Sequence, residues 1–417
     1  MYKGVRKTEG IIILIYLILF SPLSIAGNLT AETTKEFNLK LIKNIKVDYT
    51  IKSLKVSPAA QYVYLMDLEG CKFYIASVSN LSLVKKVKFY ETSGIGYNYK
   101  HHRKIPSIQE KPVECDISTD GRYVWVSLHN AYSVVVYDTE EMNYNTSNGD
   151  YKKVKSINYT NGITNILKLR EIKVGRTPKV VKFSPDQKYV YVTNWHSSSV
   201  SVIDAVKFKL IKNVKIGPQN GWVIPRGITF TPDSKFAYIA NMGGDSLTLI
   251  DVKNGHIPIK EIYDVGRSPR HLVISPDGKY LYISNNVGAT VRKLDLSSNK
   301  VEGVCKVGKN PRTIDISPDG KYLFSVNYGS KSVSVINTDT MKVVLTKGTG
   351  NKPIGVTITP DGKELWVSHY AENYVSVFEI EKKPETRIQE AKAKGQKLEI
   401  REQLKTRESD LNRLFEN

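Results

Sequence analysis

Cysteine, tryptophan and methionine are scarce in this 417-residue chain, which contains three, four and five of them. An odd number of cysteines excludes a fully paired disulfide framework, although a bond between Cys71 and Cys115 in an oxidising compartment stays open. The patterns Cys-x-x-Cys-His and His-x-x-x-His are absent, as are phosphate loops and serine-hydrolase motifs. We therefore expect no metal ion, haem or other cofactor.

Long apolar segments are also scarce. The one uninterrupted run, Ile11–Phe20, follows three basic residues and precedes the small residues Ser24-Ile25-Ala26. Ten helical residues rise about 15 Å, half of the ~30 Å of hydrocarbon in a membrane. We predict a signal peptide over residues 1–26 and a linker over residues 27–37, with an uncleaved membrane anchor as the alternative. The protein is then exported to the periplasm, the cell surface or the medium, without a transmembrane segment in the mature chain.

Negative charge is in deficit, because 61 lysines and arginines face 41 aspartates and glutamates, a formal net charge of +20. An excess of this size favours anionic partners and solubility but carries no information about the fold.

What the chain has is a repeat. Residues 275–280 read Ser-Pro-Asp-Gly-Lys-Tyr, residues 317–322 repeat them, and five weaker copies follow the same pattern. The proline or its equivalent stands at positions 58, 119, 185, 232, 276, 318 and 360, at intervals of 61, 66, 47, 44, 42 and 42 residues. Seven copies predict seven structural units, and the two long intervals predict inserts at residues 91–111 and 140–164, the second a mobile connection.

Each copy has the sequence of a β-hairpin. Proline presets φ, aspartate bonds the local backbone and glycine accepts a positive φ, as a tight turn requires. The segment before the turn alternates apolar and variable residues with period two, and Tyr/Val-rich segments such as Tyr189–Asn194 and Val200–Asp204 follow it. Four antiparallel strands per repeat are typical of a propeller blade, so we predict an all-β, seven-bladed β-propeller over residues 38–380.

The two ends of the repeat region complement each other. The seventh repeat ends after its third strand, near Phe378, whereas Asn38–Val47 resembles the fourth strand Lys209–Ile216. We predict that this N-terminal strand completes blade seven, which closes the ring and removes exposed sheet edges. Residues 381–417 alternate charges of both signs with a thin apolar stripe and are predicted to form a charged helical tail.

The motif Tyr191-Val192-Thr193-Asn194 spells the name of a known family, and the chain resembles the YVTN-repeat β-propellers of the WD40-like and lactonase-like superfamily over residues 38–380. The resemblance implies a seven-bladed fold in which the connections entering the inner strands share one face with the loops between second and third strands. It does not fix a function, because propellers serve as enzymes and as scaffolds.

That shared face is predicted to be basic and aromatic. Segments such as Gly266-Arg267-Ser268-Pro269-Arg270 place cations at the entry to several inner strands, and aromatic residues recur after the second strands. Mutually repelling cations beside aromatic rings suit an anionic ligand. The ligand-binding residues predicted here are Arg176, Lys179, Trp195, Trp222, Arg226, Arg267, Arg270, Lys309, Arg312, Tyr328, Lys352 and Tyr370.

The leading hypothesis is a non-catalytic exported binding or scaffold protein whose top face takes an anionic ligand or protein partner, with nucleic acid or a polyanionic glycan as further candidates. The alternatives are a lactonase-like hydrolase, for which Glu114 and His271 are the only candidate pair, and a surface adhesin that binds polyanions. Deeper in the channel, Asp116 and Asp315 are interpreted as charge partners of two inner-strand lysines, Lys55 and Lys182.

Overall fold

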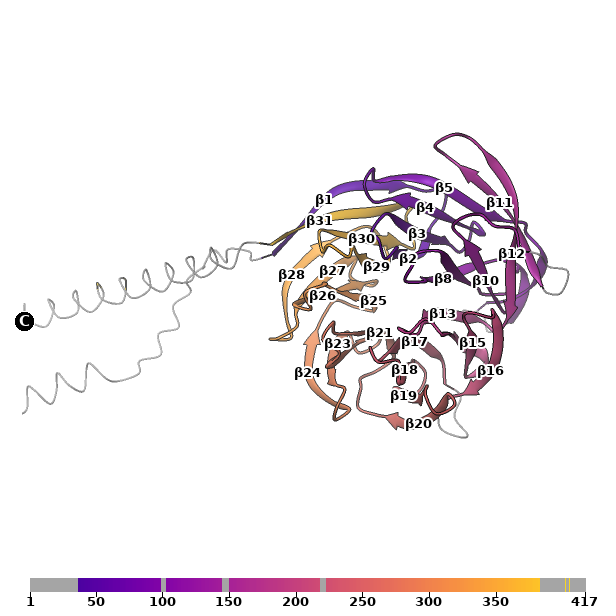
Figure 1. Ribbon diagram of the computed structural model, residues 1–417. Helices are drawn as coiled ribbons and strands as arrows, with labels where there is room; N and C mark the ends of the chain where they lie inside the picture. Colours follow the sequence, from indigo (N-terminus) through magenta and orange to yellow (C-terminus); the bar gives the residue numbers. More distant parts are fainter. Residues whose placement is uncertain are drawn as a thin grey trace, which may run out of the picture. The chain divides into compact units, whose positions relative to one another are not determined.

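The computed structural model describes residues 37–98, 103–144, 150–217 and 223–382, together with the single residues 402 and 405. The predicted signal peptide, most of the linker and, apart from those two residues, the tail beyond residue 382 lie outside the described residues. The regular secondary structure of the described part is almost entirely β-strand, and the strands form seven blades around a central axis (Figure 1). No helix in that part is long and apolar enough to cross a membrane.

The innermost strand of each blade lines the axis. These strands are β2 (Ile51–Val56), β8 (Pro112–Ile117), β13 (Pro178–Phe183), β17 (Pro225–Phe230), β21 (Pro269–Ile274), β25 (Pro311–Ile316) and β29 (Pro353–Ile358). The second strands are β3 (Tyr62–Asp67), β9 (Tyr123–Leu128), β14 (Tyr189–Asn194), β18 (Phe236–Asn241), β22 (Tyr280–Asn285), β26 (Tyr322–Asn327) and β30 (Glu364–His369).

The outer half of each blade follows the same order. The third strands are β4 (Lys72–Ser77), β10 (Ser133–Asp138), β15 (Ser199–Asp204), β19 (Ser246–Asp251), β23 (Thr290–Asp295), β27 (Ser332–Asn337) and β31 (Tyr374–Lys382). The outermost strands are β5 (Ser82–Phe89), β12 (Thr164–Lys173), β16 (Lys209–Lys215), β20 (Ile257–Ile262), β24 (Lys300–Lys306), β28 (Lys342–Gly348) and β1 (Phe37–Lys46). Every pairing between neighbours within a blade is antiparallel.

The repeated turn forms the predicted hairpin between the first and second strands. In blade five, Ser275 Oγ donates to Asp277 Oδ1 at 2.6 Å and accepts the N–H of Tyr280 at 2.9 Å. Gly278 has a φ of +71°, which a residue with a Cβ adopts only with strain. The Ser-Pro-Asp-Gly sequence therefore satisfies its own turn, which explains why it or a weaker copy of it stands at the same place in each blade.

The N-terminal strand completes blade seven, as predicted: β1 pairs with β31 in the sheet order β1-β31-β30-β29. The register of this pairing shifts between Leu41 and Lys43. Odd-numbered residues before and after the shift therefore point to opposite faces of the sheet. As a result Leu39 packs into the core between blades six and seven, whereas Ile45 packs between blades seven and one. One strand thus supports two blade interfaces.

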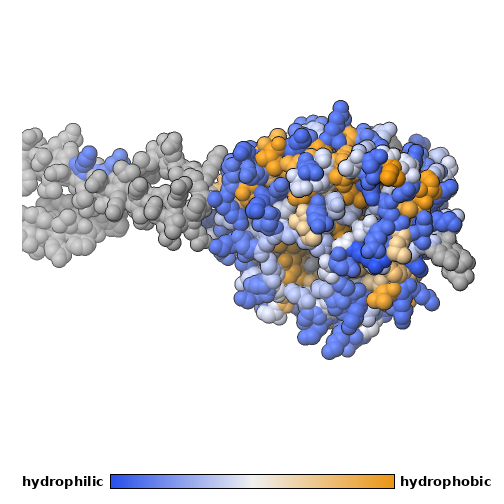
Figure 2. All heavy atoms as spheres, turned by 45° about the horizontal axis from the view of Figure 1, so that its top comes forward, coloured by the Kyte–Doolittle hydropathy of each residue, from blue (hydrophilic) through white to orange (hydrophobic). Residues whose placement is uncertain are grey.

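The hydrophobic core is divided into seven clusters, and each cluster lies between two adjacent blades. Stability therefore depends on face-to-face packing around the ring. On the face shown in Figure 2 most side chains are hydrophilic, and apolar side chains form separate groups among them. Cys71, Cys115 and Cys305 are buried and unpaired, so the bond between Cys71 and Cys115 is not formed.

Both inserts contain strands. The first forms a two-stranded hairpin of β6 (Ser93–Asn98) and β7 (Arg103–Ile108). The second, which we expected to be a mobile connection, contains β11 (Tyr151–Asn158). This strand pairs with β12 of blade two on one side and with β5 of blade one on the other, so the two blades form one nine-stranded sheet. The expectation was wrong for these eight residues, because β11 finds two strand edges to pair with.

Candidate functional site

Five inner strands carry a cation at the same position, the residue after the one that opens the strand. These residues are Lys52, Lys179, Arg226, Arg270 and Arg312, from blades one, three, four, five and six. We call them the upper ring. Blades two and seven have Val113 and Ile354 at this position, so the upper ring draws its cations from five of the seven blades.

The upper ring is largely withdrawn from solvent. Lys179, Arg226 and Arg270 are 6%, 4% and 5% exposed. Burial lowers the pKa of Lys52, Lys179 and Arg270 well below the ordinary values, and repulsion from other cations of the ring lowers them further. Burial and repulsion by Arg226 also lower the pKa of Arg312. In the absence of a ligand, the ring thus holds positive charge at a cost in free energy.

One carboxylate lies within the ring. Glu114 of blade two accepts a hydrogen bond from Arg226 Nη2 at 2.5 Å. Burial acts to raise the pKa of Glu114, but Arg226, His271 and Lys52 outweigh it and lower the pKa, which keeps the group ionised. Among the described residues, no other ion pair involves a member of the upper ring, so five cations share one anion.

Several donors of the ring have no acceptor within the described part of the chain. Nε and Nη1 of Arg226 and Nε of Arg312 are buried and make no hydrogen bond there. Among the described residues, the Arg270 guanidinium hydrogen-bonds only the Met242 sulfur, at 3.6 Å, which is a weak acceptor. Buried donors without acceptors are rare in native proteins, and an anionic oxygen is the partner they suit best.

Aromatic rings line the same end of the channel. The Lys179 ammonium lies 4.0 Å from the centre of the Trp195 ring. The Arg312 guanidinium lies 4.4 Å from the centre of the Tyr328 ring, and Lys52 lies 5.4 Å from that of Tyr370. The three aromatic residues follow the second strands of blades three, six and seven, as predicted, and they hold the cations by cation–π attraction.

The neighbouring blade fixes the backbone of the ring. Ser127 Oγ donates to the carbonyl of Lys179 at 2.6 Å, Thr193 Oγ1 to that of Arg226 at 3.0 Å, and Ser284 Oγ to that of Arg312 at 2.7 Å. Each hydroxyl comes from the second strand of the preceding blade. The cations therefore project from a rigid frame, as a preorganised site requires.

The other predicted cations lie outside the upper ring. Arg176, Arg267, Lys309 and Lys352 are exposed on the connections that lead to the inner strands, and the Lys352 ammonium lies 5.9 Å from the centre of the Tyr328 ring. The Arg176 guanidinium donates to the His196 carbonyl at 2.8 Å, so it bonds a neighbouring loop. Trp222 lies outside the described residues.

Sequence reasoning missed Lys52. The prediction rests on cations next to the proline that opens an inner strand, and blade one has Ile51 in place of that proline. Lys52 can be found from the alignment of the repeats, because it stands at the same strand position as the other four cations, whether or not a proline precedes it.

The candidate acid–base pair does not suit general acid–base catalysis in this state. His271 accepts the N–H of Ile314 on Nδ1 at 3.5 Å, and burial lowers the pKa of its imidazole to about 3. Glu114 is held ionised by Arg226. A general acid or base works best with a pKa near the operating pH, and neither group is placed there.

Metal and haem ligands are not gathered in the channel. Within the described ranges no group of three or more histidine, cysteine or acidic residues is placed to hold a metal ion. His271 borders a cavity of about 110 Å³, small beside the roughly 300–1,000 Å³ of ordinary ligand pockets. A larger cavity, which shares Lys55, Asp116 and Asp315 with the first, has no histidine, methionine, cysteine or tyrosine among its described lining. The described residues of the channel therefore do not fit a haem.

The fold and the channel define a seven-bladed β-propeller with a basic inner ring. Comparison with known proteins agrees: a family model described as Lactonase, 7-bladed beta-propeller, matches residues 159–302, and one described as Cytochrome D1 heme domain matches residues 233–404. Each covers less than half of the chain. The chain is thus related to these propeller families, and membership of the YVTN-repeat family in particular stays a prediction.

Among solved structures, the chain is similar to Kuenenia stuttgartiensis hydrazine synthase, with a TM-score of 0.60 and 19% sequence identity over 80% of this chain and 97% of that chain. At this identity the likeness concerns the fold alone. No curated protein matches. Since 1586 chains of solved structures match, the fold does not select a function.

Proposed function

We propose that this protein is an exported binding protein that takes an anionic ligand at the upper ring. The observation that carries the proposal is the charge of the ring: Lys52, Lys179, Arg226, Arg270 and Arg312 against Glu114 alone. Buried like charges repel one another strongly, and a bound anion relieves that repulsion.

The burial of the ring favours a particular class of ligand. The Arg226 side chain is buried inside the channel and is not exposed on the surface of the propeller. An extended polyanion meets exposed cations, whereas a compact carboxylate or phosphate group can enter a channel and accept bonds from Arg226 and Arg312. Trp195, Tyr328 and Tyr370 supply flat apolar surface for the rest of such a ligand.

The test uses Arg270→Met, with inorganic phosphate and citrate as probes and calorimetry as the readout. Arg270 is buried and has no carboxylate partner in the described part of the chain, so its removal lessens repulsion in the free protein. We expect a higher melting temperature without anion and at least about tenfold weaker binding, which corresponds to ~1.4 kcal/mol. The opposite signs of the two effects distinguish a binding ring from a structural one.

Arg267→Met is the matched control, because Arg267 is exposed three residues before Arg270. It should change neither the melting temperature nor the affinity by much. Wild-type protein that binds neither probe, or Arg270→Met that binds both as well as wild type, would refute the proposal. Binding of heparin or oligonucleotides without binding of the small anions would refute the compact ligand class.

A further inference from the structure

The far end of the channel contains a second cavity that the upper ring does not reach. It has a volume of about 420 Å³, opens to solvent and is bordered by the prolines of the repeated turns, such as Pro58 and Pro318. Its charged lining comes from the inner strands, three positions further along each strand than the position of the upper ring. Three residues at about 3.3 Å each separate the two levels by roughly 10 Å.

One side of this cavity is positively charged. Lys55 Nζ lies 3.8 Å from Asp116 Oδ1, and Lys182 Nζ lies 3.6 Å from Asp116 Oδ2. Asp116 also accepts the N–H of Phe183 at 2.9 Å, which fixes the carboxylate between the two lysines. The two lysine side chains, 37% and 33% exposed, thus share a single carboxylate and leave one positive charge in excess.

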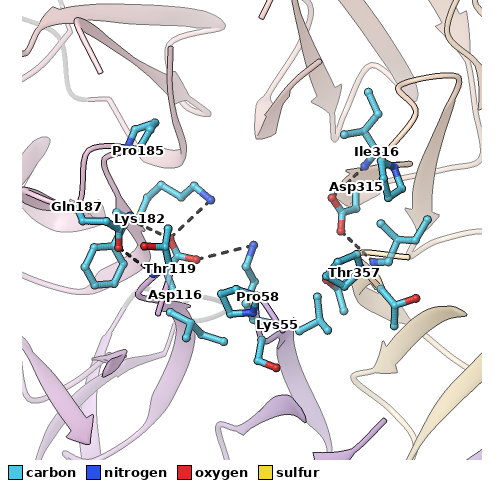
Figure 3. Close-up of a pocket in the computed structure, with 18 residues that line it drawn as sticks. Lys55, Pro58, Asp116, Thr119, Lys182, Pro185, Gln187, Asp315, Ile316 and Thr357 are labelled. Carbon is cyan, nitrogen blue, oxygen red and sulfur yellow. Dashed lines mark hydrogen bonds and ion pairs between the residues drawn. The ribbon is translucent and has the colours of Figure 1, made fainter. Parts of the chain in front are cut away.

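The opposite side is negatively charged. Asp315 accepts the N–H of Ile358 at 3.0 Å on Oδ2 and the N–H of Ile316 at 2.9 Å on Oδ1. These bonds hold the carboxylate in place but do not neutralise it, and among the described residues no cation lies within ion-pair distance of it. Figure 3 shows Asp315 across the open cavity from Asp116 and Lys182, with Lys55 extending from the wall between them.

We propose that this cavity binds a zwitterion, a small molecule with a carboxylate at one end and an ammonium group at the other, as in an amino acid. The carboxylate would meet Lys55 and Lys182, and the ammonium group would meet Asp315. A molecule with both charges satisfies both walls, whereas an anion or a cation alone satisfies one and is repelled by the other.

This site is independent of the proposed function, because its charges balance. Two lysines face two aspartates here, whereas five cations face one glutamate in the upper ring. The two levels thus select different ligands: the upper ring selects net negative charge, and the lower cavity selects separated charges of both signs.

The experiment measures binding of a series of amino acids with growing charge separation, from glycine through β-alanine and 4-aminobutyrate to 6-aminohexanoate. Acetate and propylammonium are the singly charged references. We expect one member of the series to bind at least about tenfold more tightly than either reference, since both walls then contribute. Affinities that rise no higher than those of acetate and propylammonium would overturn the proposal.

Two variants assign the contacts. Asp315→Asn keeps an oxygen acceptor for the backbone but removes the charge, and should reduce the best amino acid to the affinity of acetate. Lys182→Gln should weaken acetate and the amino acid together, and it keeps the test valid if Asp315→Asn fails to fold. Asp277→Asn, in an exposed turn, is the matched control.

The variant Arg270→Met separates this site from the upper ring. Binding of the amino acid should survive it unchanged, because Arg270 does not border the lower cavity. Unchanged binding in Asp315→Asn and Lys182→Gln would place the amino acid elsewhere and contradict the proposal, whatever the outcome at the upper ring.

Discussion

Arg226 Nη2 lies 2.5 Å from Glu114 Oε1, and this ion pair joins the inner strands of blades four and two across the channel. Both side chains are largely buried, at 5% and 15% exposure. A buried ion pair contributes little net stability by itself, but removing one partner leaves an uncompensated charge. Glu114 therefore sets both the net charge of the upper ring and the cost of keeping it empty.

Glu114→Gln should increase the affinity for phosphate and lower the stability of the free protein. The glutamine leaves five cations without an anion, so the free energy of unfolding should fall by about 3 kcal/mol. Saturating phosphate should restore much of this loss, because the bound anion takes the place of the carboxylate. Thermal unfolding with and without phosphate measures both effects. Glu140→Gln, at an exposed side chain, should change neither. Weaker phosphate binding in Glu114→Gln would contradict the interpretation.

Most of the fold could be predicted from the sequence because each blade repeats its own turn. Ser275, Asp277 and Gly278 satisfy the hairpin locally, so their recurrence reports the number of blades directly. Closure by β1 was also predictable, since a missing fourth strand at one end matched an orphan strand at the other. By contrast, β11 pairs across two blades, and no local pattern reports a partner that distant in sequence.

The site was predictable only in part. The repeat register located Lys179, Arg226, Arg270 and Arg312, but not the ion pair of Arg226 with Glu114, because positions two blades apart meet only when the ring closes. The same limit applies to the lower cavity. The interpretation of Asp116 as a partner of two lysines is confirmed. The same interpretation of Asp315 is wrong, because at the same repeat position it accepts backbone N–H groups and forms no ion pair among the described residues.

Closure of the ring depends on the apolar residues of β1. Leu39 has no exposed surface and packs between blades six and seven, so Leu39→Asp buries a charge and should lower the free energy of unfolding by at least about 3 kcal/mol. Deletion of residues 37–46 should be more severe and produce aggregation, because β31 becomes an open edge. Urea unfolding and light scattering measure these outcomes. Lys43→Ser, on an exposed part of the strand, should behave as wild type; a Leu39→Asp variant of wild-type stability would contradict closure by β1.

The seam between blades one and two depends on Glu141. Its carboxylate bonds Lys85 of β5 at 2.5 Å, Ser156 of β11 at 2.8 Å and Asn165 of β12 at 2.8 Å, so it links all three strands. Glu141→Ala should lower the free energy of unfolding by about 3 kcal/mol, since it leaves these donors unpaired in a partly buried place. Glu140→Ala is the adjacent control, with a side chain 62% exposed, and should cost less than about 0.5 kcal/mol. Similar losses in the two variants would show that the seam does not depend on this carboxylate.

Stability should fall in acid, and His271 should account for a measurable share of the fall. Burial lowers the pKa of His271 to about 3, below its usual value of ~6.5, so between these values the unfolded chain binds a proton that the folded chain does not. The contribution of the uncharged His271 to the free energy of unfolding is complete above about pH 6.5 and is lost as the pH falls toward 3. At about pH 4.5 the loss is at most ~3 kcal/mol, because two pKa units correspond to about 1.4 kcal/mol each.

His271→Asn isolates this effect, because the amide oxygen can accept the N–H of Ile314 as Nδ1 does, without titrating. Urea unfolding between about pH 7 and pH 4.5 should show a shallower loss of stability in the variant than in wild type. Some acid sensitivity should remain, since burial also lowers the pKa values of His129, His256 and His369. The quantity to measure is the number of protons that the chain takes up on unfolding, which should be smaller in the variant by up to one. An identical slope in variant and wild type would mean that the His271 imidazole is protonated in the folded channel, where it would add a further positive charge beside the upper ring.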